Sequence, residues 1–350
     1  MNISTKEVRI LFISVCFLSV SELHADHRLP EDSWTFTFRF ENDLFGGTDR
    51  NYTNGIKLSW ISPDLPWFHE SDDLPDWGKA IVKRLPFSDV EDLQRNIVFS
   101  VGQNMFTPDN TRTTDLVTDD RPYAGWLYGG IAFHNKNYRR LDTIEMQLGV
   151  VGPWSFAEET QNFVHDLRDI DNARGWDNQI KNEPGIVLIY EHKDRILTPN
   201  SLSGFGFDAI THYGAALGNV YTYANAGMEI RLGWSLPTDF GTSLIRPGGD
   251  TNAPADTKDP RYQQTSHGFS LHAFAAVTGR LVLRDIFLEG NTFRDSHSVD
   301  RELLVGDFIV GVSLIFDSLK LSYAQVFRTK EFEGQDSGHH FGSVSISYTY

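Results

Sequence analysis

The chain has 350 residues, a formal net charge of −16 and 13% aromatic residues, and its only cysteine is Cys16. The negative charge argues against a nucleic-acid partner, because binding to a phosphate backbone needs a basic surface. Beyond residue 25 no apolar run reaches the length of a membrane-spanning helix, which is about 18 residues. These observations leave a β-rich protein. It is either a soluble domain or a membrane barrel, whose strands alternate apolar and polar residues and therefore do not show as apolar runs.

The first 25 residues have the pattern of a secretory signal peptide. Lys6 and Arg9 precede an apolar run over residues 10–20, and a small residue, Ala25, follows it. We expect cleavage after Ala25, so that residues 26–350 form a single exported barrel domain. Because Cys16 lies in the removed segment, the mature chain has no cysteine and needs no disulfide in an oxidising compartment.

Two alternating segments open the mature chain. Residues 34–40 carry aromatic side chains at every even position, and residues 55–61 alternate again, so both read as strands with one apolar face. Asn42 and Asp43 end the first strand, and Thr53 begins the second. Oxygen atoms gathered there can hold a hard cation such as calcium, or these residues only shape the turn at the strand ends.

Further alternating segments fill the rest of the chain, and the last one, residues 340–350, stops on an aromatic residue. Ending on such a strand is typical of bacterial barrels, because the last strand must pair with the first to close the sheet. The total is about thirteen, whereas such barrels have even numbers, so one segment is wrong or two form one strand. The others are residues 96–103, 125–134, 142–151, 185–191, 204–214, 221–232, 268–277, 281–288, 303–316 and 319–327.

One connection carries a helical pattern that ends near Ile170. Ser155 and Glu158 have the spacing of a capping box. Gln161 and His165 lie one turn apart on a polar face. The opposite side is an apolar stripe that must pack on the rim of the barrel or on the bilayer interface. Its members are Phe156, Phe163, Val164, Leu167 and Ile170.

Several polar residues near this helix are candidates for chemistry. His165 can take a proton near neutral pH, or it is an ordinary surface histidine. Gln161 can orient the imidazole or a water, or it is a surface amide. Asp171 is either a metal ligand or a solvated carboxylate. Arg121, in Arg121-Pro122-Tyr123-Ala124-Gly125-Trp126, can bind a phosphate, pair with a carboxylate or anchor an aromatic girdle.

Short motifs in a fixed order resemble the outer-membrane lipid A 3′-O-deacylase family. They cover residues 42 to about 183, and after residue 190 only the barrel character and the aromatic terminus support the resemblance. The motifs are Glu41-Asn42-Asp43, Tyr52-Thr53-x-Gly55, Asp120 to Gly125, Gly152-Pro153, Gln161-x-x-x-His165 and Trp176-x-x-Gln179-x-x-Asn182.

The resemblance implies a twelve-stranded barrel, a calcium-dependent hydrolase, and a site between the outer wall and a loop helix. Asp171 stands where the family carries a longer Glu, and Arg112 is the basic residue nearest to a substrate-phosphate position. The residues on the family's site positions are Asn42, Asp43, Thr53, Gln161 and His165.

The resemblance also implies a reaction. Calcium bound by Asp43 and Asp171 would polarise the ester carbonyl, while His165 would activate a water that releases the 3′-linked acyloxyacyl chain of lipid A. The expected partners are lipid A or lipopolysaccharide and outer-membrane lipids, and we expect a monomer. Three alternatives remain. They are a porin or structural anchor with charges lining an open lumen, a phospholipase with a serine beside its histidine, and a soluble periplasmic carbohydrate binder.

Overall fold

The computed structural model describes residues 32–43, 51–65, 67–68, 93–169, 171–197, 204–242, 244–262 and 268–350, with a few positions between 76 and 83. The expected signal peptide over residues 1–25, its cleavage site, and Ile170 of the apolar stripe lie outside the described residues. The same holds for the side chain of Leu167.

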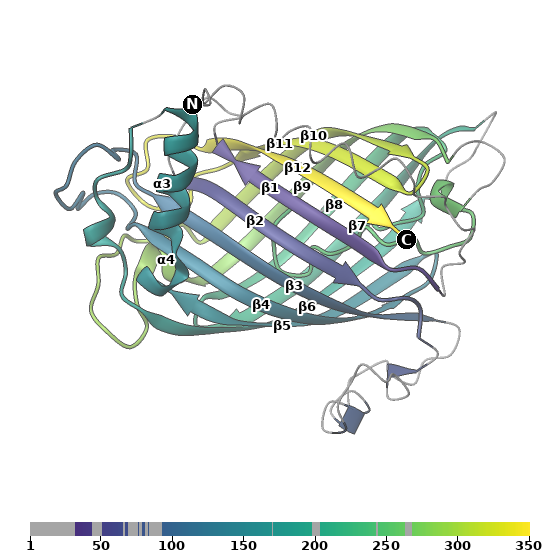
Figure 1. Cartoon of the computed structure of the whole chain (residues 1–350), viewed down its shortest axis with the longest axis horizontal. Coiled ribbons are helices and arrows are strands. Elements are labelled where there is room, and N and C mark those ends of the chain that lie inside the picture. The colour runs from purple at the N-terminus through teal and green to yellow at the C-terminus, as the bar shows by residue number, and fades with distance from the viewer. Residues whose placement is uncertain are drawn as a thin grey trace, which may run out of the picture.

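Within the described chain, twelve antiparallel strands form one closed barrel, in which each strand pairs with its neighbours in sequence and β12 pairs with β1 (Figure 1). The predicted transmembrane barrel of twelve strands is therefore confirmed. The strands are β1 (Thr35–Asn42), β2 (Asn51–Ile61), β3 (Gln94–Thr107), β4 (Ala124–Lys136), β5 (Arg140–Val151), β6 (Glu183–Leu197), β7 (Phe205–Gly218), β8 (Tyr221–Trp234), β9 (Ser270–Asp285), β10 (Leu304–Phe316), β11 (Leu319–Arg328) and β12 (His339–Thr349).

The surplus strand of the sequence count is explained by β9. Its continuous register against β10 runs from Ser270 to Leu281, so the predicted segments 268–277 and 281–288 belong to one strand. Gly279, between them, keeps the alternation, and a side chain added there would meet nothing within 4 Å. The last residues of the second segment turn instead into the short helix α4 (Ile286–Glu289).

Each strand divides its residues between lumen and lipid. In β1, Thr37 and Arg39 are buried in the lumen, whereas Phe36 and Phe38 face outward and are half-buried. The outward positions of the later strands carry large exposed apolar residues, as lipid contact requires. Examples are Val101, Leu148, Leu188, Val277 and Val312. Among the described residues, no helix has both the length and the apolar character to cross a membrane.

The connection between β8 and β9 fills the lumen instead of hanging outside it. We call residues 235–262, of which 243 is not described, the lumen loop. Its Asp250 accepts from Arg39 at 2.6 Å and lies 2.7 Å from the Lys57 Nζ, so charges of β1 and β2 are neutralised. A second carboxylate, Asp239, forms ion pairs with three cations, each within 3.0 Å. These are Arg231, Arg261 and Lys320.

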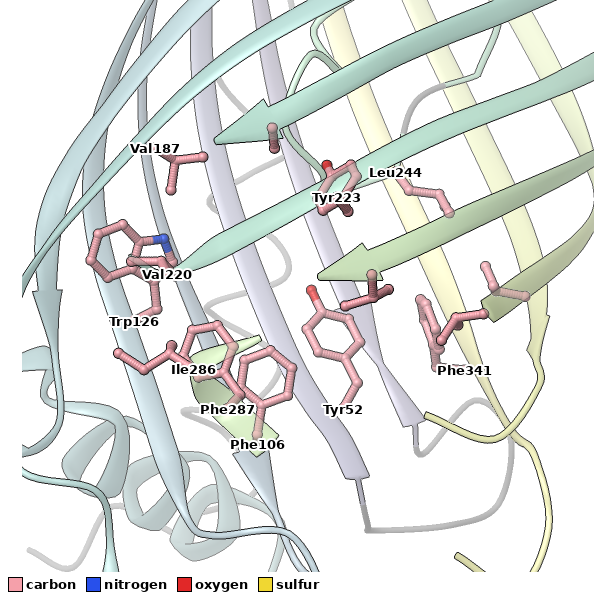
Figure 2. Packing of buried hydrophobic residues seen from close by; sticks show 14 of the residues in the cluster. Tyr52, Phe106, Trp126, Val187, Val220, Tyr223, Leu244, Ile286, Phe287 and Phe341 are labelled. Atoms are coloured by element: carbon pink, nitrogen blue, oxygen red, sulfur yellow. The ribbon is translucent and has the colours of Figure 1, made fainter. Parts of the chain in front are cut away.

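Aromatic side chains close the lumen at the end where α4 lies. Phe287 of α4 stacks on Phe106 of β3 with 4.3 Å between the ring centroids, and Leu244 of the lumen loop reaches the same cluster (Figure 2). A cavity of about 70 Å³ remains between the lumen loop and this cluster. That is room for several water molecules, since each needs about 10–15 Å³ of such water-accessible volume.

Candidate functional site

The helix α3 (Ala157–Arg168) lies on the outside of the barrel, over β3 and β4 (Figure 1). Gly125 of β4 makes this approach possible, because a side chain there would come within 2.0 Å of the Ser155 Oγ and 2.4 Å of the Ala157 Cβ. Beside this contact a small buried cluster joins β3, the β3–β4 connection and the α3 loop. Its members are Met105, Tyr123, Ala157, Ala173 and Trp176.

The start of α3 differs from the predicted capping box. The N-cap residue is Phe156, and it makes no side-chain cap. Ser155 belongs to the preceding turn η4 (Pro153–Ser155), where its hydroxyl donates to the carbonyl of Gly152 at 2.6 Å. The hydroxyl of Ser155 is therefore used by the tight turn at Gly152-Pro153 and does not form the predicted capping box.

The polar side of α3 faces the barrel wall. Gln161 and His165 are each 3% exposed, whereas Phe163 is 63% and Phe156 is 56% exposed. These exposures decide between the barrel rim and the bilayer interface as the surface on which the apolar stripe packs. Packing of Phe156 and Phe163 on the barrel rim is wrong, because the residues that contact the wall lie on the other side of the helix. His165 is buried, which also excludes an ordinary surface histidine.

His165 is oriented by a backbone carbonyl. Its Nδ1 lies 2.8 Å from the carbonyl oxygen of Asp171. A carbonyl oxygen can only accept, so Nδ1 carries the proton and the lone pair of the neutral ring is on Nε2. This tautomer can take a proton at Nε2.

Gln161 is oriented by Trp176, a residue of the sequence motifs to which no role was given. The indole Nε1 of Trp176 donates to the Gln161 Oε1 at 2.7 Å. The Gln161 Nε2 is buried and has no hydrogen-bond partner among the described residues. Because its oxygen is already used, Gln161 presents a donor to the space beside it.

The strands supply a row of polar groups on the same outer wall. Asn42 of β1 is opposite Asn54 of β2, which is in turn opposite Met105 of β3, and Met105 is opposite Gly125. Glu41, next to Asn42, faces the lumen, where it accepts from the Ile245 amide. Alternation therefore places Asn42 outside. The strand register therefore places Asn42 and Asn54 in one row with Met105 and Gly125. The loop that carries α3 packs on the wall at Met105 and Gly125.

Asn54 and Thr53 complete this row. Thr53 is buried, and its hydroxyl lies 2.7 Å from the hydroxyl oxygen of Thr107. Asn54 is 3% exposed, and its Oδ1 has no hydrogen-bond partner among the described residues. Sequence reasoning missed Asn54, although it is the unspecified position of Tyr52-Thr53-x-Gly55.

The two expected metal ligands have different surroundings. Asp43 is fully buried at the end of β1, whereas Asp171 is exposed and uses its backbone carbonyl to hold His165. In the part of the chain that the structure describes, no three His, Cys, Asp or Glu residues are arranged to hold a metal ion. The wall does offer amide and hydroxyl oxygens from Asn42, Thr53 and Asn54, and Asp43 adds a buried carboxylate directly after Asn42; these are donor types that calcium accepts.

The two arginines predicted to bind substrate also differ. Arg121 is buried, pairs with Glu331 at 3.2 Å and lies 4.9 Å from the Phe106 ring centroid. Its charge is therefore neutralised inside the end of the barrel. Arg112 is exposed in the β3–β4 connection. That connection is tied to the α3 loop, because the Arg174 amide donates to the carbonyl of Thr111 at 2.9 Å. A phosphate-binding role for either arginine stays a prediction.

Fold and site together define a membrane barrel with a buried histidine held between its outer wall and a loop helix. Residues 11–350 match the family model described as "Outer membrane protein LpxR", and the chain belongs to this family. The structure of LpxR from Salmonella typhimurium is similar, with a TM-score of 0.70 and 18% identity over 90% of this chain and 99% of that chain.

A more distant similarity is to the β domain of the Bordetella autotransporter Brka, with a TM-score of 0.41 and 9% identity over 91% of this chain and 98% of that chain. No curated protein sequence matches the chain.

Proposed function

We propose that this chain is a calcium-dependent lipid A deacylase that hydrolyses the 3′-linked acyloxyacyl ester in the outer membrane. Membership of the LpxR family supports a lipid A deacylase of the outer membrane. The observation that carries the proposal is His165, buried against the outer wall with its Nδ1 held by the carbonyl of Asp171. A general base on the lipid side of a barrel suits a substrate that cannot leave the membrane.

His165 is the proton acceptor in this mechanism. Its Nε2 removes a proton from the water that attacks the ester carbonyl. The Asp171 carbonyl keeps the ring in the required tautomer and still accepts from Nδ1 when the ring is charged. The proton on Nε2 is then available for the departing alcohol oxygen.

Gln161 and the polar row on the wall act on the carbonyl side. Trp176 holds the Gln161 amide so that its Nε2 can donate to the oxyanion that forms on attack. Asp43 would hold calcium with the oxygens of Asn42, Thr53 and Asn54, and a ligand role for the Asp171 carboxylate stays a prediction. A bound calcium ion supplies a positive charge that stabilises the oxyanion. The partners are lipid A or lipopolysaccharide and the surrounding outer-membrane lipids, and we propose a monomeric enzyme.

The alternatives have less support. A porin needs an open lumen, whereas the described lumen loop enters it and pairs its Asp239 and Asp250 with cations of the strands. A serine phospholipase needs a serine beside its histidine. Ser155, the serine next to α3, donates its hydroxyl to Gly152 instead.

The first prediction concerns His165→Asn. The Asn side-chain amide can still donate to the Asp171 carbonyl, but it cannot accept a proton at neutral pH. We expect a folded, membrane-inserted variant whose deacylation rate falls by about 10²–10⁴-fold. The measurement is the mass of lipid A after incubation with purified protein. His192→Asn, at the other end of the outer wall, is the matched control, and wild-type cleavage by His165→Asn would exclude the proposed base.

The second prediction concerns calcium. A chelator should stop lipid A cleavage without changing the heat-dependent gel shift of the barrel, and calcium should restore activity better than magnesium. Magnesium demands stricter octahedral geometry and gives up its waters reluctantly. Asp43→Asn should raise the calcium concentration needed for half-maximal activity. Full activity in excess chelator would remove the metal from the mechanism.

A further inference from the structure

The helix α3 has a buried side and an exposed side. Successive residues are about 100° apart around a helix, so residues four apart lie close together and residues seven apart nearly coincide. Ala157, Gln161 and His165 form the buried side on the barrel wall. Phe163 is exposed on the opposite, outward side, flanked by the exposed Glu159, four residues before it, and Asp166, three residues after it. Phe156 is exposed at the start of the helix, and Trp154 lies just before it in η4. We call Trp154, Phe156 and Phe163 the aromatic side of α3.

The aromatic side is exposed although its residues are large and apolar. Trp154 is 67%, Phe163 is 63% and Phe156 is 56% exposed. Large apolar side chains exposed together on one segment mark contact with a partner or a membrane rather than with water. On the same helix, the polar Gln161 and His165 are buried. The helix therefore turns its large aromatic residues away from the protein, which is expected where the surroundings are lipid.

The backbone at Phe156 gives a second, independent observation. Its φ is 57°, a left-handed conformation that bulky residues rarely adopt and that glycine or asparagine accepts easily. The turn itself would be better served by one of those residues. Phenylalanine at this position therefore requires a reason outside the turn, and its exposed ring supplies one.

The aromatic side also continues the lipid-facing surface of the barrel. Leu148, an outward residue of β5, is 50% exposed, and β5 leads directly through Gly152 to Trp154. On the neighbouring wall, Val101 of β3 is 51% exposed, two residues before Gln103, whose Nε2 donates to the Ser155 carbonyl at 2.6 Å. The apolar outward residues of these strands thus run up to Gln103 and Gly152, at the base of α3.

We propose that the aromatic side of α3 is a lipid-docking surface that lies among the outer-leaflet lipids, at the boundary between headgroups and acyl chains. Aromatic residues concentrate at this depth, and helices with one apolar side lie there in the plane of the membrane. The wall side then holds His165 at the depth where acyl chains are esterified to their headgroup. This last point rests on the proposed function, whereas the location of the helix does not.

Quenching of tryptophan fluorescence tests the location without any catalytic readout. Purified protein is inserted into phospholipid vesicles whose acyl chains carry bromine either near the headgroup or near the chain end. The contribution of Trp154 is obtained by subtracting the signal of Trp154→Phe. We expect bromine near the headgroup to quench this contribution at least twofold more than bromine at the chain end.

Two other results would overturn the proposal. If aqueous iodide, but neither brominated lipid, quenches the Trp154 contribution, then water covers the aromatic side. If iodide and both lipids fail to quench it, protein covers it, and a second copy of the chain would be the occupant. Chemical cross-linking in the same vesicles would identify that second copy.

A variant pair links this surface to the reaction. The double variant Phe156→Asn, Phe163→Gln removes two rings, and asparagine accepts the left-handed backbone at residue 156. We expect the ratio of deacylation rates, lipid A in vesicles over lipid A in detergent micelles, to fall about tenfold or more. Phe293→Gln, at a ring 72% exposed in the β9–β10 connection, is the matched control and should leave the ratio unchanged.

The two experiments separate the proposals. Quenching by headgroup-level bromine with no cleavage of lipid A in vesicles or micelles would uphold the surface and reject the proposed function. Cleavage of lipid A with an unchanged rate ratio in the double variant would reject the surface alone.

Discussion

At the scale of single residues, the site depends on groups that orient one another. His165 is held by the carbonyl of Asp171, and Gln161 is held by the indole of Trp176. A carbonyl orients the imidazole without the electrostatic pull of a carboxylate. The tautomer of His165 therefore depends on the path of the chain at Asp171 and not on its side chain.

Trp176→Phe tests the orientation of Gln161. Phenylalanine keeps a buried ring but cannot donate to the Gln161 Oε1, so the amide can rotate and its Nε2 loses its fixed direction. A neutral hydrogen bond contributes about 0.5–1.5 kcal/mol, which corresponds to a fall in kcat of about 2–13-fold. The KM for lipid A should change less than kcat. Trp234→Phe, at an exposed tryptophan that ends β8 and lies outside the α3 loop, is the control, and equal kcat losses in both variants would contradict a positioning role.

The sequence identified the local part of the site and missed the long-range part. Gln161 and His165 were found because a spacing of four residues places them on one helical face. Asn54 was missed because its partner across the sheet is defined by register and by the irregularity between Tyr52 and Asn54. Trp176 was missed because its hydrogen bond to Gln161 spans 15 residues of irregular chain, which no periodicity encodes.

At the scale of elements, the contact between α3 and β4 decides whether the site exists. Strand alternation predicted the barrel because lumen and lipid impose opposite preferences on successive residues. It divided β9 into two segments, since Thr278-Gly279-Arg280 interrupts the apolar pattern without interrupting the strand. The place of α3 on the wall depends on the missing side chain of Gly125, a single position that hydropathy does not mark.

Gly125→Ala should separate the helix from the wall. The new Cβ would lie 2.0 Å from the Ser155 Oγ and 2.4 Å from the Ala157 Cβ, so η4 and the start of α3 must move away. Limited proteolysis should cut the α3 loop at least tenfold faster than in wild type, while the heat-dependent gel shift of the barrel persists. Gly279→Ala is a matched control on the outer wall, since its Cβ would meet nothing within 4 Å. Equal proteolysis of both variants would contradict the proposed contact.

At the scale of the whole molecule, the lumen loop fills the barrel and joins strands on different sides of it through ion pairs. The sequence shows residues 239–264 only as a polar loop, because nothing local tells whether such a segment lies outside or inside a barrel. The residues that would reveal its place inside the barrel are charged residues on strands far apart in the chain. Arg39, Lys57, Arg231 and Lys320 point charges into the lumen, and Asp239 and Asp250 of the lumen loop neutralise them. Only closure of the sheet brings these charges together.

The ion pairs of Asp250 predict how stability depends on pH. Burial alone would raise the pKa of this carboxyl, but the charges of Lys57 and Arg39 outweigh burial and hold the pKa below its usual range. Since an aspartate in the unfolded chain has a pKa of about 3.9, the pairs stabilise the fold above that pH. Their contribution is lost as the pH falls from about 4 through the lower pKa of the folded state.

Asp250→Asn tests this account. Removing one partner of a buried ion pair costs about 3–5 kcal/mol, so at pH 7 the gel shift of the barrel should occur at a clearly lower temperature than in wild type. Between pH 7 and pH 3 the wild-type transition temperature should fall further than that of the variant, which no longer has this carboxyl to protonate. Asp317→Asn, in the exposed β10–β11 turn with a φ of 50° that asparagine accepts, is the control and should behave as wild type at both pH values. If Asp250→Asn keeps the wild-type transition temperature at pH 7, then the lumen loop does not stabilise the barrel through Arg39 and Lys57.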